Sequence, residues 1–143
     1  MTQQVKQTDG AIGYVELIYA ISNNLAYADV KNPAGAFVTP SLASVTAAAA
    51  SAQFAPDTDF RVSIINAPGA DAYPISSFTW FLVRPDMKDP VKAKALKSFL
   101  EWIITDEAQQ QAVALHYSPL PQPVVALVKE RVKTLKAQGK PIA

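Results

Sequence analysis

Cysteine is absent from this chain of 143 residues, and histidine occurs once, at His116. Without cysteine the chain can form no disulfide and has no thiol nucleophile or thiolate metal ligand. A single histidine excludes a metal site with two histidine ligands. A cysteine-free chain fits the cytoplasm, and it fits an extracytoplasmic protein that folds without disulfides equally well, so the compartment stays open.

An excess of either charge is also missing. Thirteen basic residues face twelve acidic ones, which gives a net charge of +1. Nucleic-acid binding and polybasic membrane anchoring both depend on a surplus of positive charge. The composition therefore supports neither function.

Long apolar runs are missing as well. No stretch approaches the roughly 20 apolar residues that a membrane span requires. The first ten residues, MTQQVKQTDG, lack the apolar region of a signal peptide, so we expect no leader in this chain. The sequence predicts a soluble protein, and its start says nothing about export.

What is present is a globular composition. Half of the residues are hydrophobic and 17% are charged, which is typical of folded rather than disordered chains. The length suits one domain or two small lobes. A chain of this size typically buries roughly 68–70% of its unfolded surface, so we expect a core that needs no covalent staple.

Apolar spacing and capping residues predict helices along the chain, above all in its last third. Asp89 is expected to cap a helix whose first residue is Pro90. Proline suits that position, because it lacks the backbone N–H group that would have no partner there. Thr105 begins another helix, with acidic residues near its positive end. The predicted helices cover residues 2–8, 16–23, 41–53, a stretch from Pro90, a stretch from Thr105, and 123–138.

Two helical faces are expected to be buried. In the helix from Pro90 the apolar stripe consists of Val91, Ala95, Phe99 and Trp102/Ile103. In the last helix it consists of Val124, Val128, Val132 and Leu135, and Gly139 is expected to stop that helix.

Strands are predicted at residues 11–15, 25–30, 61–66 and 75–83. The last of these, ISSFTWFLV, is the strongest, and its apolar residues fall on both faces, as in a strand covered on both sides. Residues 32–35 have the chemistry of a turn. Residues 118–123 hold three prolines and must be extended.

The stretch GAIGYVELIYA contains Gly10 and Gly13, which raises the question of a phosphate-cradling loop. It lacks the third glycine of a dinucleotide-binding loop and the Gly-Lys-Ser/Thr of a P-loop. We therefore interpret the two glycines as serving a tight turn and close packing.

Other candidate sites are weak. His116 ends a predicted helix, where contact with the helix dipole is the expected role, and no GxSxG motif accompanies it as a hydrolase would need. Asp57 and Asp59 in APDTDF resemble part of a calcium loop without its glycine and distal glutamate, so we expect a solvated turn.

Basic and aromatic residues form the remaining candidate features. Two sets of lysines form basic helical faces, which we expect to be solvated, and three aromatic residues of the 75–83 strand are expected in the core. None of them indicates an activity. The lysines are Lys92, Lys94, Lys97, Lys129, Lys133 and Lys136, and the aromatic residues are Phe78, Trp80 and Phe81.

Several stretches match one family in order and spacing: GAIGYVELIYAISNNLAYADVKN, FVTPSLASVTAAAA, FRVSIINAPGADAYPISSFTWFLV and HYSPLPQPVVALV. They resemble the phosphate-binding protein of bacterial phosphate ABC transporters. GAIGYVE, APGADAYPI and YSPLP are the most specific parts. The resemblance extends over nearly all of the chain but covers roughly the C-terminal half of that family's protein.

The resemblance implies a two-lobed α/β protein that closes around phosphate. In that family the anion is held by helix N-termini, Ser/Thr hydroxyls, one arginine and one aspartate, which suits dehydrated phosphate. These ligands belong to motifs of the N-terminal half, including an Arg-x-x-x-Ser-Gly-Thr segment. The arginines here, Arg61, Arg84 and Arg131, have no such context. We therefore carry over no phosphate ligand, and we predict no catalytic residue, metal site or cofactor.

The resemblance also sets the remaining expectations. The fold class is α/β, an incomplete type II periplasmic-binding-protein-like fold, the C-terminal half of two lobes. Residues 1–74 would belong to the second lobe and residues 75–143 to the first, as crossing strand and C-terminal helices, although the two parts can merge into one compact domain. The protein would not be an enzyme.

Its expected role is in phosphate uptake by an ABC importer, and the alternative is a non-binding structural or interaction module. The expected partners are phosphate, given a complementing N-terminal half, an ABC permease, and further copies of the chain in an oligomer or domain swap. We expect no nucleic acid, and we expect a periplasmic or extracytoplasmic location.

Overall fold

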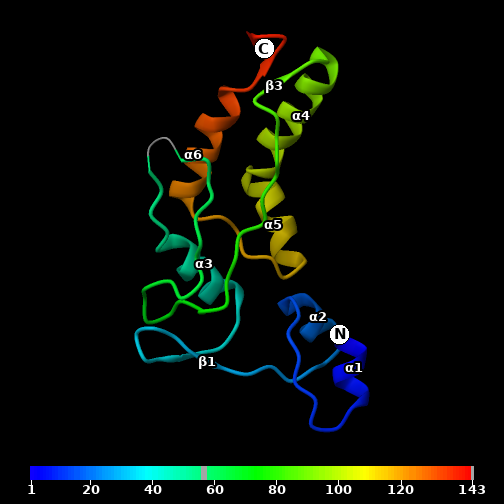
Figure 1. Cartoon of the computed structure of the whole chain (residues 1–143), viewed down its shortest axis with the longest axis vertical. Coiled ribbons are helices and arrows are strands. Elements are labelled where there is room, and N and C mark those ends of the chain that lie inside the picture. The colour runs from blue at the N-terminus through cyan, green and yellow to red at the C-terminus, as the bar shows by residue number, and fades with distance from the viewer. Residues whose placement is uncertain (56–57, 143) are drawn as a thin grey trace.

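The computed structural model describes residues 1–55 and 58–142. Within them it has six helices and five strands of two residues each. The molecule is elongated, with the two N-terminal helices at one end of the long axis and the C-terminal strands at the other (Figure 1). The helices, and not a sheet, therefore organise the chain.

The N-terminal arm consists of α1 (Thr2–Gln7) and α2 (Leu17–Ser22), joined by an extended stretch. Both helices were predicted, and their ends agree within about a residue. The strand predicted at 11–15 is wrong. Ile12 and Tyr14 are 98% and 83% exposed, and none of the strand pairings within residues 1–55 and 58–142 includes this stretch, although a strand depends on such pairing.

A short hairpin follows the arm. Strand β1 (Val30–Lys31) pairs antiparallel with β2 (Phe37–Val38). The turn predicted at 32–35 is confirmed, with the Gly35 N–H group donating to the Asn32 carbonyl at 2.9 Å. Of the strand predicted at 25–30, Val30 alone is in a strand.

Helix α3 (Leu42–Ala50) confirms a predicted helix and owes its start to a capping box. The Ser41 hydroxyl accepts the Ser44 N–H at 3.1 Å, and the Ser44 hydroxyl accepts the Ser41 N–H at 2.9 Å. The alanine-rich inner face of the helix packs on the loop near residue 70, where Ala48, Ala67 and Ala72 form a small cluster.

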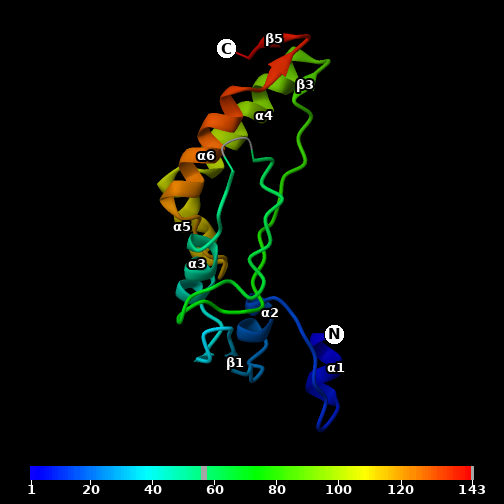
Figure 2. The same ribbon diagram turned by 60° about the vertical axis from the view of Figure 1, so that its left-hand side comes forward.

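Residues 60–66 and 75–83 run beside one another as mostly extended chain, as both views show (Figures 1 and 2), and the first segment has positive φ at its two end residues, Phe60 and Asn66. Neither is in a strand, so the strands predicted at 61–66 and 75–83 are wrong as strands. A single backbone hydrogen bond, from the Asn66 N–H to the Pro74 carbonyl at 2.9 Å, joins them at one end. The sequence of the two segments favours an extended backbone, but they do not form a ladder of hydrogen bonds with each other.

The C-terminal layer packs α4 (Pro90–Ile103), α5 (Asp106–Ala114) and α6 (Gln122–Lys133) together. The cap prediction is confirmed, since the Asp89 carboxylate accepts the N–H groups of Val91 and Lys92 at 3.0 and 3.1 Å. Thr105 caps α5 as predicted. The core of the layer is Ala93, Leu100, Val132, Leu135 and Ile142.

The face predicted to be buried on α4 is wrong. Val91, Phe99 and Trp102 are 79%, 44% and 46% exposed, whereas Ala93 and Leu100 are buried. Helix α6 and the C-terminal strands lie against the side of α4 that carries Ala93 and Leu100. Of the predicted stripe, Ile103 packs against this core, whereas Val91, Phe99 and Trp102 lie on the more exposed side of the helix.

The predicted end of the last helix is also wrong. Helix α6 ends at Lys133, and the chain continues into β4 (Lys136–Ala137) and β5 (Lys140–Pro141). Gln138 and Gly139 form the two-residue turn between these strands, and both have positive φ, as a type I′ turn requires. Gly139 therefore lies in the turn of a hairpin and does not cap a helix.

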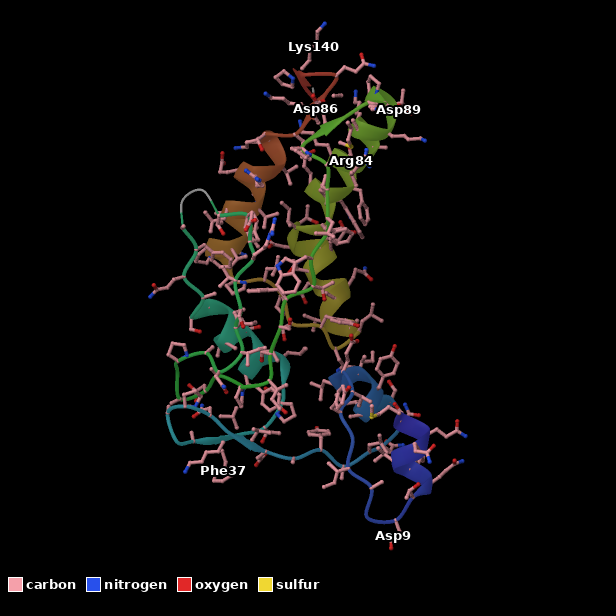
Figure 3. The ribbon with its side chains drawn as sticks, viewed as in Figure 1. Asp9, Phe37, Arg84, Asp86, Asp89 and Lys140 are labelled. Atoms are coloured by element: carbon pink, nitrogen blue, oxygen red, sulfur yellow. The ribbon has the colours of Figure 1, made fainter. Side chains whose placement is uncertain are left out.

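Strand β3 (Asp86–Met87) pairs parallel with β4 and completes a three-stranded sheet at the C-terminal tip. Asp86 and Lys140 lie at this tip (Figure 3). The Asp86 carboxylate accepts the Gly139 N–H through both oxygens, at 3.1 and 2.9 Å. This bond holds the turn of the hairpin against the segment that leads into α4.

The surface of the molecule is large for its mass. The chain exposes 9927 Å², whereas a compact monomer of 15.4 kDa exposes about 7,200 Å². It thus buries about 55% of its unfolded surface, below the roughly 68–70% that its length predicted. None of the helices in residues 1–55 and 58–142 is long and apolar enough to cross a membrane.

Candidate functional site

The two glycines of GAIG serve a turn and a close contact. Gly10 has φ of +74°, which suits the turn after α1. A Cβ at Gly13 would lie 2.6 Å from Cγ2 of Val5 in α1, so glycine is needed for α1 to pack there. The contact is with a helix, whereas we expected a strand, but the interpretation as packing agrees with this geometry.

His116 ends α5 through its backbone. Its φ is +59°, and its N–H group donates to Val113 while the Tyr117 N–H group donates to Ala112, at 3.0 and 2.9 Å. This pair of bonds is a Schellman motif with His116 at the left-handed position that glycine usually occupies. The expected position at a helix end is confirmed, and the backbone rather than the imidazole accounts for it.

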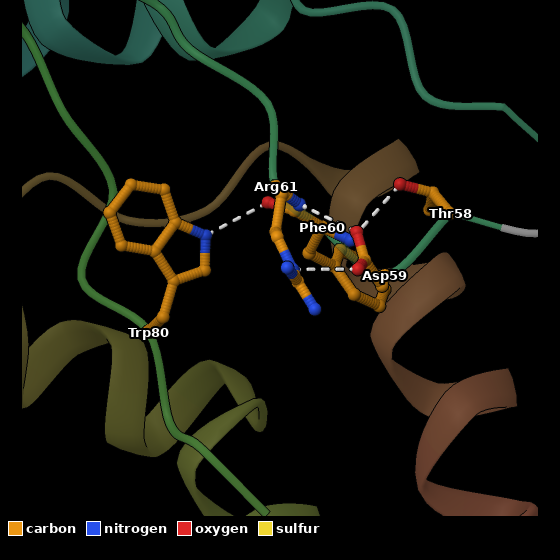
Figure 4. Close-up of polar contacts among 5 residues, drawn as sticks. All are labelled: Thr58, Asp59, Phe60, Arg61 and Trp80. Atoms are coloured by element: carbon orange, nitrogen blue, oxygen red, sulfur yellow. Dashed lines mark hydrogen bonds and ion pairs between the residues drawn. The ribbon is translucent and has the colours of Figure 1, made fainter.

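Asp59 and Arg61 form a local ion pair, with 2.7 Å between Oδ2 and Nε, and their side chains are 51% and 86% exposed (Figure 4). The Asp59 carboxylate also accepts the Arg61 N–H at 3.2 Å. Asp57, the other half of the suspected calcium motif, lies outside the described residues. Within residues 1–55 and 58–142, no three acidic or histidine side chains gather as a metal ion requires.

The lysines do not all lie on solvated faces as expected. Lys97 is half-buried, and its ammonium group donates to the Ile142 carbonyl at 2.7 Å, which fastens the C-terminal residues to α4. Lys133 pairs with Glu130 at 2.7 Å on the surface of α6. The other four lysines are exposed, in agreement with the expectation: Lys92, Lys94, Lys129 and Lys136.

The aromatic residues of the 75–83 segment are not in a closed core. Trp80 and Phe81 are 47% and 58% exposed, so the predicted burial is wrong for both. Phe78 is half-buried. The Trp80 indole N–H donates to the Phe60 carbonyl at 2.8 Å (Figure 4), which holds this ring against the neighbouring extended segment.

Helix N-termini are natural anion sites. In α3 and α5, the hydroxyls of Ser41 and Thr105 occupy the first amides, and in α4 the carboxylate of Asp89 does so. Helix α5 also carries Asp106 and Glu107 in its first turn. An oxyanion at these starts would have to displace a cap, and at α4 and α5 it would meet negative charge.

Arginine is the other usual oxyanion ligand. Arg61 is engaged by Asp59, and Arg84 and Arg131 are exposed, on the segment before β3 and on α6. The three side chains come from three separate parts of the chain.

A buried asparagine that the sequence pattern did not single out joins two loops. Asn32 is 5% exposed, and its side-chain nitrogen lies 2.9, 2.8 and 3.2 Å from the carbonyls of Gly69, Ala70 and Ala72. Its side-chain oxygen accepts the Ala36 N–H at 3.0 Å. Asn32 thus joins the β1–β2 turn to the loop near residue 70. Only an Asn-Pro turn was visible in the sequence.

A second contact that the sequence did not reveal joins the N-terminal arm to the residues after α5. The Tyr117 hydroxyl donates to the Glu16 carboxylate at 2.7 Å, and this hydrogen bond raises the pKa of Tyr117 above its ordinary value. Burial, with the nearby Asp29 charge, raises the pKa of Tyr73. The shift at Tyr117 therefore arises from its contact with the N-terminal arm, and the shift at Tyr73 arises first from burial.

The chain matches the family model of a PBP superfamily domain over residues 1–107. Because this match extends over most of the chain, the protein belongs to the PBP superfamily. The fold class is thereby confirmed as α/β, an incomplete periplasmic-binding-protein-like fold with mixed helices and small sheets.

Three individual relatives with the same name illustrate the match. The chain is 41% identical over 87% of its length to the phosphate-binding protein PstS of Xylella fastidiosa. It is 36% identical over 87% of its length to that of Pasteurella multocida, and 33% identical over 92% of its length to that of Methanocaldococcus jannaschii. The resemblance found in the sequence is therefore confirmed.

The chain matches only part of the length of these relatives. The chain spans 34%, 36% and 36% of these three relatives, which is about a third of their length. The expectation that the chain represents part of the family's protein agrees with these values.

Proposed function

We propose that the chain takes part in phosphate uptake by an ABC importer as a partial solute-binding protein that has no phosphate site of its own. The observation that carries this proposal is the identity of 33–41% to proteins named phosphate-binding protein, over 87–92% of the chain. In this proposal the protein is not an enzyme and acts in the periplasm or another extracytoplasmic space, with an ABC permease as partner.

The second part of the proposal concerns the site. It is supported by the occupied starts of α3, α4 and α5 and by the Arg61–Asp59 pair. Binding of dehydrated phosphate requires several donors that converge on one point. We propose that the ligands come from a complementing N-terminal half, and that no residue of this chain is a phosphate ligand, a metal ligand or a catalytic group.

The division of the chain belongs to the same proposal. Residues 1–74 would complete the second lobe, and residues 75–143 the first, once the complementing half is present. The large exposed surface of the chain, 9927 Å², supports association either with that half or with further copies. The alternative function, a non-binding structural or interaction module, would use the same surface without phosphate.

Titration calorimetry tests the function. The chain alone is titrated with phosphate, and sulfate serves as the control ligand. The titration is repeated after mixing with the N-terminal region of the Xylella fastidiosa relative, and that region alone is the second control.

Heat with phosphate only in the mixture would support the proposal. Heat in no sample, although the two parts bind each other, would favour the non-binding module. Selective binding by the chain alone would overturn the claim that it has no site.

A further inference from the structure

The basic residues of the chain are unevenly distributed. Ten of the thirteen lie in residues 84–97 and 129–140, together with three acidic residues, so these two segments carry a net charge of +7. The rest of the chain has three basic and nine acidic residues, a net charge of −6. The whole-chain charge of +1 hides these two regions of opposite sign, and such an asymmetry indicates an anionic partner.

The fold brings the two basic segments together at the C-terminal tip, and we call them the basic end (residues 84–97 and 129–140). Strand β4 pairs with both β3 and β5, and the Asp86 carboxylate accepts the Gly139 N–H. The Lys97 ammonium group fastens Ile142 to α4. Figure 3 shows Lys140 at the extremity of the molecule, with Asp86 close by.

Most basic side chains of this end are exposed and form no ion pair. Among the described residues, the ion pairs here are those of Lys97 with Glu101 and of Lys133 with Glu130. Asp86 and Asp89 are engaged by backbone N–H groups. The eight exposed residues without an ion pair are Arg84, Lys88, Lys92, Lys94, Lys129, Arg131, Lys136 and Lys140.

Local stability does not account for the lysines at the start of α4. Lys92 and Lys94 lie near the positive end of the helix dipole, where a cation is unfavourable, and the first turn of α4 contains no acidic residue. Arg131 and Lys133 lie in the last turn of α6, where cations are favourable. The α4 lysines therefore call for an explanation outside the helix.

A complementing N-terminal half does not explain this end as it explains the apolar surface of residues 75–83. Covering the eight exposed charges would take each of them out of water, which costs free energy unless each one meets a partner. The apolar segment has no such cost of burial. We therefore expect the basic end to stay accessible when the other half is bound.

The kind of basic residue favours one anionic partner over others. Eight of the ten are lysines, which are hydrated point charges on flexible stems, whereas arginine binds carboxylates with a rigid fork. Lysine is depleted in protein–protein interfaces, where fixing each long side chain costs entropy. A fluid layer of anionic lipid headgroups attracts lysines without fixing them in one geometry.

We propose that the basic end binds the surface of a bilayer that contains anionic phospholipids, with the acidic remainder of the chain directed away from that surface. In the proposed function the chain serves a permease that lies in a membrane, and this contact keeps the chain beside it. The contact requires no phosphate, so it is tested separately from the proposed function.

Co-sedimentation of the full chain with vesicles, in buffer without phosphate, tests this contact. The chain is expected to bind vesicles of phosphatidylcholine and phosphatidylglycerol, and to stay in solution with vesicles of phosphatidylcholine alone. Added salt is expected to weaken the binding, because it screens the attraction between exposed charges. A chain that does not bind the anionic vesicles, or that binds both kinds equally, would overturn the proposal.

The variant Lys88→Gln/Lys92→Gln/Lys140→Gln removes three exposed charges of the basic end. It is expected to weaken binding to the mixed vesicles at least about 30-fold, since one basic residue near an anionic surface contributes about fivefold. None of the three side chains forms an ion pair among the described residues, and circular dichroism verifies the helix content of the variant.

Lys6→Gln/Lys31→Gln/Arg61→Gln is the matched control, because it removes the three basic residues outside the basic end and changes the net charge equally. It is expected to change vesicle binding less than about threefold, since salt screens charges that are distant from the contact. Equal weakening by both variants would show that total charge governs binding, and would overturn the proposal.

Polyglutamate is the probe for an acidic protein surface as the partner. At equal concentration of negative charge, it is expected to displace the chain from the mixed vesicles less effectively than unlabelled mixed vesicles do. Equal or stronger displacement by polyglutamate would favour an acidic protein surface and overturn the lipid assignment.

The complementing half is tested as the remaining occupant. Vesicle binding is repeated after the chain is mixed with the N-terminal region of the Xylella fastidiosa relative, and binding by the mixture is expected to persist. Loss of vesicle binding in the complex would show that the other half covers the basic end, and would overturn the proposal whatever the calorimetry with phosphate shows.

Discussion

The C-terminal layer and the two adjacent extended segments, residues 60–66 and 75–83, differ in what they need from the rest of the chain. In the layer, α4 satisfies its backbone internally, Asp89 caps it, and Leu100 packs on Val132 and Leu135. The 75–83 segment has a stronger apolar pattern, yet its backbone finds no ladder and Leu82 is 99% exposed. A helix forms from local bonds, whereas a strand exists only through its neighbour.

The largest expected effect is on the core of the layer. Leu100→Ala should lower the free energy of unfolding by about 2–4 kcal/mol, because Leu100 is 7% exposed and its removal leaves a cavity. Ile65→Ala, in the extended 60–66 segment and 62% exposed, should cost less than about 1 kcal/mol. Urea unfolding measures both. Equal losses would contradict the contrast between the two regions.

The next effect concerns the contact that holds the loops together. Asn32→Ala should cost about 1–3 kcal/mol, because it removes the buried donor to three carbonyls of the loop near residue 70. The control is Asn23→Ala, whose side chain makes one exposed bond to the Tyr19 carbonyl at 2.9 Å and should cost less than about 0.5 kcal/mol. Thermal unfolding compares the two variants, and a larger loss at Asn23 would contradict the assignment.

A smaller effect should have the opposite sign. His116→Gly should stabilise the protein by about 0.5–1 kcal/mol, since φ of +59° at this position costs a residue with a Cβ but not glycine. Ala114→Gly, two residues earlier and within α5, should destabilise it by about 0.5–1 kcal/mol. Chemical unfolding of the two variants tests this reversal of sign. Destabilisation by both would contradict the prediction that positive φ at His116 costs stability.

The smallest effect is the dependence on pH of the contact between the N-terminal arm and the layer. The Glu16 carboxylate raises the pKa of Tyr117 above 10.0. Because the folded-state pKa is the higher one, the contact contributes fully below pH 10 or so and is lost as the pH rises through the pKa of Tyr117. Spectrophotometric titration should show that Tyr117→Phe removes a component that ionises above the ordinary tyrosine value. Glu16→Gln should lower that component, and no change would contradict the contact.

Local signals made the helices predictable and left the tertiary arrangement open. Asp89 followed by Pro90, and Thr105 followed by two acids, specify helix starts through bonds within a few residues. The face that α4 buries depends on where α6 lies, so Val91 and Phe99 were assigned to the wrong side. Gly139 supplies positive φ both to a helix stop and to a hairpin, and the sequence did not decide between them.

The family was identifiable from stretches such as GAIGYVE, APGADAYPI and YSPLP, and the matches to the family model and to the named relatives confirm it. The contacts of Asn32 with the loop 37–40 residues away could not be predicted, because a lone buried amide leaves no periodic pattern. Likewise, the exposure of Trp80 and Phe81 depends on whether a neighbour covers the segment, which is a property of the assembly and not of its nine residues.

Hydrogen exchange in a dilute, monomeric sample tests the central contrast most directly. The amides of α4 from residue 94 onward should be protected by the helix and its core, while those of residues 75–83 should exchange nearly as fast as an unstructured chain. Protection of residues 75–83 equal to that of α4 in the monomer would contradict the account, because it would show that the chain completes this strand by itself.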